Sequence, residues 1–309
     1  MRYKRLLQAF YQTTWAILPE KLLEIRSFLH MKVHGADVSR EAVDAIIAAR
    51  REDSGVQMSG RVAVLPMFGT FVHRASDIDE SSGLLSTEGL GVLYDALLAD
   101  KAVKAIVLVF DSPGGSVFGL EELAKKIFNG RDQKRTWALA DPMAASAAYY
   151  LASQAEQVYV TPSGQVGSIG TITAHEDLSA MLEQLGVKVS LITAGKYKGE
   201  GNPYGPLDDD ARASLQDTVN QYYGQFVAAV ARGRGVSEAT VRGGYGQGRM
   251  LTAKDAKAAG MVDGIATLEQ LLNRLGSGAA SGPGAAVAAP SLGDTDTLRK
   301  KIDLIALDS

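Results

Sequence analysis

A continuous apolar run at residues 105–110 constrains the fold of this chain more than any other segment. A strand with one face in solvent alternates apolar and polar residues, whereas a strand buried on both faces is apolar throughout. From Val62 onward, short apolar runs of this kind alternate with segments of helical periodicity. Because strands that alternate with helices form parallel sheets covered on both faces, the pattern predicts an α/β domain with a parallel sheet.

The same patterning places the expected elements along the chain. We expect strands over 62–65, 105–110, 136–140, 158–160, 169–173 and 187–193, and helices over 89–98, 117–128, 143–153, 176–185 and 208–233. The last of these helices begins with three aspartates, which favour the positive end of a helix, and it ends at a glycine.

Four regions of different composition indicate the domain organisation. Residues 1–57 are expected to form a helical N-terminal arm, in which Ser39 can cap a helix, and residues 58–274 form the main domain. Residues 275–293 are rich in Gly, Ala and Ser and predict a flexible linker. Residues 294–309 carry apolar side chains at helical spacing and predict a short amphipathic segment.

Composition excludes several kinds of chemistry. The 309 residues include no cysteine, which excludes a disulfide framework, a thiolate nucleophile and a cysteine-rich zinc site. The four histidines form no helical zinc-protease motif, and we expect no metal and no other cofactor. A formal net charge of −3 gives no reason to expect a nucleic-acid partner.

The N-terminus and the hydropathy pattern bear on location. No apolar run reaches the roughly 18–20 residues that a membrane helix needs. Arg2, Lys4 and Arg5 imitate the start of a signal peptide, but polar residues interrupt the apolar stretch that follows. We therefore expect no membrane anchor and a cytoplasmic protein.

The first segment with chemical potential is DSPGG at 111–115, directly after the apolar run. Pro113 has no N–H group, whereas Gly114 and Gly115 leave their N–H groups unshielded. Two such donors could form an oxyanion hole, although the same residues also suit an ordinary Pro-Gly turn.

The second segment is DPMAASAAYY at 141–150, after the next expected strand. Ser146 falls in the first turn of a predicted helix, where free N–H groups and the helix dipole stabilise negative charge. The N–H group of Ala147 could be a second oxyanion donor. The alternative is an alanine-rich packing helix with an incidental serine.

A serine nucleophile needs a base, and AGKYKGEGNP at 194–203 offers Lys196 and Lys198. Burial lowers the pKa of a lysine, so a desolvated lysine can accept the serine proton, whereas solvated loop lysines are the alternative. Ser168, in GSIG at 167–170, could hydrogen-bond a buried amine. His175 is the competing base, in a triad of the Ser-His-Asp type.

The order and combination of these segments carry more information than any one of them. DSPGG, MAASAAYY, GSIG and AGKYK closely resemble the signal peptide peptidase A family of Ser–Lys peptidases. The resemblance extends over about residues 62–265 and includes GRMLTAKDAKAAGMVD at 248–263. It implies for residues 58–274 the Clp protease/crotonase fold, an α/β fold of repeated β-β-α units.

The resemblance also implies roles for individual residues. Ser146 matches the nucleophile, Lys198 the general base and Ser168 the residue that orients the lysine. Lys196 fits less well, because the family motif places the lysine three residues after the glycine that matches Gly195. The implied oxyanion hole consists of backbone N–H groups, from Gly114 or Gly115 together with Ala147. Because this dyad is commonly completed between domains or subunits, a chain of single-repeat length implies a homo-oligomer.

Three further segments resemble one branch of the family. WAILPE at 15–20, AHEDL at 174–178 and GKYKGEGNPY at 195–204 are similar to members from tailed bacteriophages and prophages. Members of that branch are prohead, or capsid maturation, proteases. The resemblance therefore implies a serine endopeptidase that processes scaffold or head proteins inside the procapsid, in the cytoplasm of the bacterial host.

Three alternative functions stay open. The first is a housekeeping protease of the signal peptide peptidase type, which acts on released signal peptides. The second is a crotonase-type acyl-CoA hydratase, which would use carboxylates as acid and base on the same fold. The third is a non-catalytic capsid-assembly protein, in which the arm, linker and terminal segment provide assembly contacts.

Overall fold

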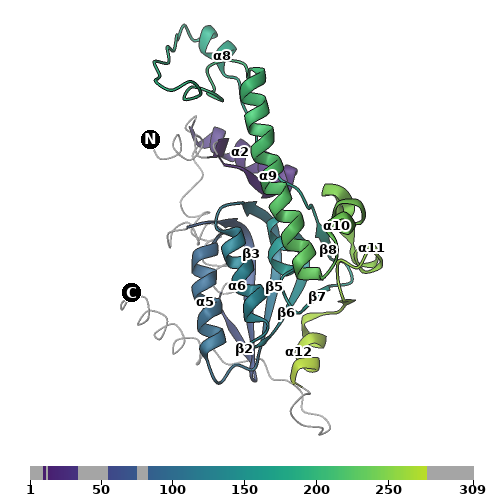
Figure 1. Cartoon of the computed structure of the whole chain (residues 1–309). Helices are drawn as coiled ribbons and strands as arrows, with labels where there is room; N and C mark the ends of the chain where they lie inside the picture. Colours follow the sequence, from purple (N-terminus) through teal and green to yellow (C-terminus); the bar gives the residue numbers. More distant parts are fainter. Residues whose placement is uncertain (1–9, 12, 34–54, 75–82, 277–309) are drawn as a thin grey trace.

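The computed structural model describes residues 10–11, 13–33, 55–74 and 83–276 (Figure 1). Within these ranges ten strands form one sheet, whose central order is β10-β7-β6-β5-β3-β2. The strands are β1 (Trp15–Ile17), β2 (Gln57–Ser59), β3 (Val62–Val72), β4 (Leu84–Ser86), β5 (Ala105–Ser116), β6 (Arg135–Ala145), β7 (Gln157–Val160), β8 (Gln165–Gly167), β9 (Met250–Thr252) and β10 (Gly264–Ile265). No helix in the described ranges is long and apolar enough to cross a membrane.

The helices connect and cover these strands. They are α2 (Pro19–Val33), α5 (Thr87–Ala99), α6 (Leu120–Gly130), α7 (Ala147–Ala152), α8 (Ser179–Gln184), α9 (Asp209–Arg234), α10 (Glu238–Gly244), α11 (Ala253–Ala258) and α12 (Leu268–Gly276), with a short 3₁₀ turn at Gly246–Gly248. Strands β3, β5, β6, β7 and β10 run parallel to one another. Strand β2 pairs antiparallel with β3 at one edge. The α/β fold with a mostly parallel sheet is therefore confirmed.

The apolar run in β5 is buried on both faces of the sheet, as its composition predicts. Ile106, Leu108 and Phe110 lie in the main core, beneath α5, α6, α7 and α9. Val107 and Val109 lie in a second core on the opposite face, which α12 covers. Successive side chains of a strand point to opposite faces, so a strand between two cores must be apolar at every position.

Three strands, β3, β5 and β6, extend beyond their predicted ends. Residues 111–115, which were expected to form a turn, continue β5, and residues 141–145 continue β6, so the helix predicted over 143–153 begins only at Ala147. The reason is tertiary pairing: Gly114 and Gly115 pair with β3, and Met143 and Ala144 pair with β8. Proline and glycine do not end a strand whose remaining backbone groups find partners on neighbouring strands.

Two predicted strands are not strands in this chain. Residues 169–173 form only an isolated bridge, between Ile172 and Trp15. Residues 187–193 pair with no strand of the described chain, and Val187, Val189 and Leu191 remain 42–49% exposed. A β-prone composition reports what suits a pleated surface, but a strand also needs a ladder partner.

The N-terminal arm is only partly helical. Helix α2 agrees with the prediction, but residues 15–17 form strand β1, which pairs antiparallel with the end of β5. The helix expected after Ser39, the linker from residue 277 onward and the terminal amphipathic segment lie outside the described residues.

One glycine in α9 allows close packing against the main core. A Cβ atom on Gly233 would lie 2.1 Å from the carbonyl oxygen of Ser153, whereas a Cβ on Gly224 in the same helix would meet nothing within 4 Å. We predict that Gly233→Ala lowers the free energy of unfolding by about 1–3 kcal/mol through overpacking. Gly224→Ala should raise it by about 0.5–1 kcal/mol, because alanine favours a helix interior. Urea unfolding of both variants checks this pair, and equal effects at the two sites would contradict the packing argument.

Candidate active site

Ser146 lies where β6 ends and α7 begins. Its backbone has φ 53° and ψ −116°, a conformation that is strained for a residue with a Cβ atom. The Ser146 N–H donates to the carbonyl of Gly167 at 2.7 Å, and its hydroxyl donates to the carbonyl of Gly170 at 3.4 Å. Its surface is completely buried, with 0% exposed.

The space beside Ser146 opens because two parallel strands part. β5 and β6 pair as far as Ser112 and Ala144, two residues before Ser146. β6 ends at Ala145, one residue later, and pairs with β8 along its opposite edge, while the end of β5 continues between β3 and β1. The serine therefore stands at the point where the sheet divides, which is where a parallel sheet exposes ligand sites at its carboxyl end.

Gly114 is the residue of the β5 extension that approaches the serine. Its φ of +106° requires glycine, and a Cβ atom placed on it would lie 3.0 Å from the Cβ of Ser146. Its N–H group donates to the hydroxyl of Ser112 at 3.1 Å. Gly115 fits between strands, because a Cβ there would lie 2.1 Å from the carbonyl oxygen of Phe71. Gly114 is therefore the closer of the two predicted oxyanion-hole residues.

Ser168 and Ala147 also lie at this point of the fold. Ala147 is the first residue of α7 and directly follows Ser146. Ser168 follows β8, with 6% of its surface exposed, and its N–H donates to the carbonyl of Arg249. Its φ is +54°. Among the described residues, the non-glycine residues with positive φ are Ser146, Ser168 and Gln247. Strained backbone of this kind clusters at functional sites.

The predicted base is not beside the serine in this chain. Lys198 is exposed, in the segment between α8 and α9, which Figure 1 shows at the tip of α9, away from the sheet. The neighbouring candidate, Lys196, has its ammonium on the ring and hydroxyl of Tyr197. Ser146 and Ser168 are thus brought together with Gly114, Gly115 and Ala147, whereas Lys198 is not.

His175, the competing base, is engaged elsewhere. Its Nε2 atom lies 3.2 Å from the carbonyl oxygen of Gly205. The next residue, Glu176, forms an ion pair with Arg26 and a hydrogen bond with Tyr11, both in the N-terminal arm. The segment that carries His175 is therefore tied to the arm and to the loop before α9.

A partly buried polar network, which the motifs did not indicate, anchors α7. The Tyr150 hydroxyl donates to Glu121 at 2.7 Å, and Arg232 pairs with the same carboxylate at 3.0 Å. Arg232 also donates to the side chain of Gln154, and the Tyr149 hydroxyl donates to the carbonyl of Met261. The two tyrosines after Ser146 in the sequence were the available signal, since a buried tyrosine hydroxyl usually has a partner.

Burial and hydrogen bonding within this network shift the pKa values of Glu121 and Tyr150. Burial raises the pKa of Glu121, but the hydrogen bonds from Arg232 and Tyr150 outweigh burial and hold that pKa below its ordinary value. Burial and the hydrogen bond to Glu121 raise the pKa of Tyr150 well above its ordinary value. Glu121 is therefore ionised at neutral pH and Tyr150 is protonated.

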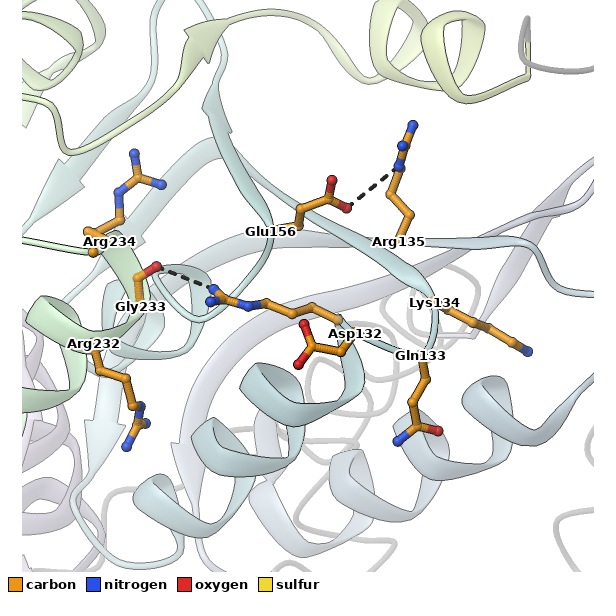
Figure 2. A pocket seen from close by; sticks show the side chains of 10 residues that line it. Asp132, Gln133, Lys134, Arg135, Glu156, Arg232, Gly233 and Arg234 are labelled. Carbon is orange, nitrogen blue, oxygen red and sulfur yellow. Dashed lines mark hydrogen bonds and ion pairs between the residues drawn. The ribbon is translucent and has the colours of Figure 1, made fainter.

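A surface pocket lies apart from this site. It has a volume of about 630 Å³ and lies at the start of β6, the end opposite Ser146 (Figure 2). Its cations are already engaged: Arg135 faces Glu156, and Arg131 and Lys134 donate to backbone carbonyls. Its residues are Arg131, Asp132, Gln133, Lys134, Arg135, Glu156, Arg232, Gly233, Arg234 and Gly235.

Comparison with known proteins identifies one family and several relatives. Residues 129–281 match Peptidase family S49. The chain is 37% identical over 206 residues to Capsid assembly protease C of Escherichia phage lambda, covering 64% of this chain and 47% of that protein. It is 35% identical over 182 residues to Head-tail preconnector protein GP5 of Enterobacteria phage P21, covering 59% of this chain and 36% of that protein.

A further relative comes from a bacterium. The putative signal peptide peptidase SppA of Enterococcus faecium is 30% identical over 177 residues, covering 57% of this chain and 51% of that protein. The chain thus spans about half the length, or less, of these curated relatives.

The network around α7 generates a stability prediction. We expect Glu121→Gln to lower the free energy of unfolding at neutral pH by about 1–3 kcal/mol, because Arg232 and Tyr150 lose a charged partner. A carboxylate with a lowered pKa stabilises the fold above its unfolded pKa, about 4.3, and this contribution is lost as the pH falls through the folded pKa.

Urea unfolding at neutral pH and at about pH 3 measures both effects. Stability of the parent protein should fall further on acidification than stability of Glu121→Gln. Glu122→Gln, at the exposed neighbouring position, is the matched control and should leave both values unchanged. An equal loss in the two variants would show that the network does not depend on the Glu121 charge.

Proposed function

Because residues 129–281 match Peptidase family S49, we propose that this chain is a serine endopeptidase with a Ser–Lys dyad. Ser146 is the nucleophile, Lys198 the general base and Ser168 the residue that orients the lysine. The backbone N–H groups of Gly114 or Gly115 and of Ala147 hold the oxyanion.

One observation carries this proposal: two strained serines meet at the dividing point of the sheet. Ser146 and Ser168 both have positive φ and are both buried. They lie on adjacent strand ends, because the Ser146 N–H bonds to Gly167, the neighbour of Ser168. Strain costs on the order of 1–3 kcal/mol per residue, which supports a role for both positions beyond packing.

The general base reaches the serine from a second copy of the chain. Lys198 has no hydrogen bond or ion pair through its ammonium within the described residues, and its segment extends away from the sheet (Figure 1). The same segment exposes Val187, Val189 and Leu191 at alternate positions, as in a strand that lacks its partner. A homo-oligomer would cover these side chains and desolvate the lysine together, and burial favours the neutral amine that a base requires.

Peptide cleavage proceeds in two steps, formation of an acyl-enzyme and its hydrolysis. The neutral amine of Lys198 accepts the hydroxyl proton of Ser146 while the Ser146 Oγ atom attacks the peptide carbonyl carbon. Backbone N–H groups stabilise the oxyanion, the C–N bond breaks, and the lysine gives its proton to the leaving amine. A water molecule then hydrolyses the acyl-enzyme through the same base.

The substrate that we propose is a phage head or scaffold protein. Support comes from the relatives in phages lambda and P21, whose names refer to capsid assembly and to a head-tail preconnector. The protease would then act in the cytoplasm of the bacterial host, within the procapsid.

A second candidate is a housekeeping protease that degrades released signal peptides, which the relative from Enterococcus faecium favours. Incubation with a head or scaffold protein encoded beside this chain, and separately with a signal peptide, distinguishes the two. If the intact protein cleaved neither, a non-catalytic role in capsid assembly would be favoured.

Complementation tests the dyad and its division between subunits. Ser146→Ala and Lys198→Ala should each abolish cleavage of a fluorogenic peptide, whereas Lys196→Ala and His175→Ala should retain it. Co-expression of the two inactive variants should then restore about a quarter of the parent activity, because in a random closed assembly half of the subunits keep the serine and half of their neighbours keep the lysine.

The co-expressed mixture is decisive because a dyad within one chain predicts a different result. In that arrangement every subunit of the mixture lacks one of the two groups, and activity stays at the level of the single variants. Loss of activity in His175→Ala, with Lys198→Ala active, would replace the lysine by the histidine as the base.

A further inference from the structure

Strand β1 fills the gap that opens beside Ser146. On one side Trp15, Ala16 and Ile17 pair with Ser116, Gly115 and Gly114 of β5, and the Leu18 N–H donates to the carbonyl of Pro113 at 2.9 Å. On the other side Trp15 and Ile172 exchange two hydrogen bonds of 2.8 Å. An extended segment from the N-terminal arm is therefore held between two backbone edges, as in peptide binding by strand addition.

The backbone of β1 lies against Gly114, on the side that faces Ser146. The position of a Cβ atom on Gly114 would lie 2.2 Å from the carbonyl oxygen of Ala16, 2.9 Å from the Cα of Ile17 and 3.0 Å from the Cβ of Ser146. A peptide carbonyl that Ser146 attacks must approach its Oγ atom to about 3 Å, beside the same glycine. The arm and a substrate therefore compete for one place.

The side chains of β1 alternate between two environments. Ala16 enters the main core with 0% of its surface exposed, whereas Ile17 packs in a small separate cluster with Phe10, Leu22 and Leu29. The free space beside Ala16, next to Tyr150 and Phe226, is about 10 Å³. That is roughly the space that one water molecule needs, so a much larger side chain does not fit there.

The rest of the arm is attached by contacts that do not belong to the main core. Helix α2 contributes Leu22 and Leu29 to the small cluster that also contains Phe10 and Ile17. It is also held by Glu176, which pairs with Arg26 and lies 3.3 Å from the Nε2 of His30. Elements with few buried apolar contacts open at lower free energy than the core, so the arm can leave while the sheet stays folded.

We propose that residues 15–18 are a built-in pseudosubstrate strand, which blocks Ser146 until an extended substrate segment displaces it. This inference rests on the proposed peptidase function. It also assigns a substrate preference: the substrate residue that replaces Ala16 is small, because it enters the same space beside Tyr150 and Phe226.

A reversible cross-link tests the block. Trp15 and Ser116 are directly opposite, and the bond from the Val117 N–H to the carbonyl of Thr14 makes them a non-hydrogen-bonded pair, in which Cβ atoms are closest. Because the chain has no cysteine, Trp15→Cys with Ser116→Cys provides a single defined disulfide. We expect the oxidised protein to lose at least tenfold in peptide cleavage and in labelling of Ser146 by a fluorophosphonate, and reductant to restore both.

The controls separate failure of this inference from failure of the proposed function. The single variants Trp15→Cys and Ser116→Cys carry no cross-link, so their rates should not respond to reductant. A cross-linked protein, verified by mass, that cleaves as fast as its reduced form overturns the block while the peptidase stands. If the parent and the reduced double variant neither cleave nor label, the peptidase function fails, and the block fails with it.

Substitution of Ala16 provides a test without a cross-link. Ala16→Leu cannot seat in the core and should raise cleavage of a small-residue peptide several-fold, whereas the matched Ala16→Ser should leave it near the parent rate. A peptide with leucine at the corresponding position should be cleaved more slowly than its alanine counterpart. Unchanged or reduced cleavage in Ala16→Leu, with the fold intact by circular dichroism, would show that β1 supports the site instead of blocking it.

Discussion

The parting of β5 from β6 is the constraint on which the rest of this structure depends. Two parallel strands that separate leave backbone N–H and C=O groups without a ladder partner, and buried groups of this kind must be satisfied. Here β1 takes the free edge of β5 and the Ser112 hydroxyl accepts from the Gly114 N–H, while β6 ends at Ala145, still paired with β8 on its other edge. The gap that places Ser146 beside Gly114 therefore also leaves a backbone edge that an extended peptide can pair with.

In the proposed mechanism the position of Ser146 prepares it for attack, but one chain alone does not complete that chemistry. The proposed oxyanion donors come from the end of β5 and the start of α7, and the network of Glu121, Tyr150 and Arg232 anchors α7. The lysine comes from an exposed segment next to a β-prone run that pairs with nothing in its own chain. In the proposed assembly, one burial event supplies the strand partner, covers the apolar side chains and desolvates the base.

Features that depend on local sequence could be predicted, whereas features that depend on contacts between distant residues could not. The apolar run in β5 and the helical periodicity of α5, α6 and α9 report local burial, and these elements lie where the pattern places them. The strand ends at 111–115 and 141–145 were missed because pairing with β3 and β8, which no local pattern records, overrides proline and glycine. The order of the motifs supports the family resemblance, and that resemblance led us to expect Ser146, Ser168 and Gly114 close together. The contacts of Glu121 with Arg232 join positions that are too distant in sequence for any motif.

The arm was the least predictable part, and the reason bears on how the site could be controlled. Its residues 15–17 were expected to be helical with the rest of the arm, yet they are extended because the open edge of β5 offers backbone partners that a helix would forgo. Ala16 satisfies two demands at once: it is small enough for the space beside Tyr150 and sits opposite Gly115, where the strands exchange hydrogen bonds. A substrate must meet the same two demands to replace it, so the residues that block the site also define what can open it.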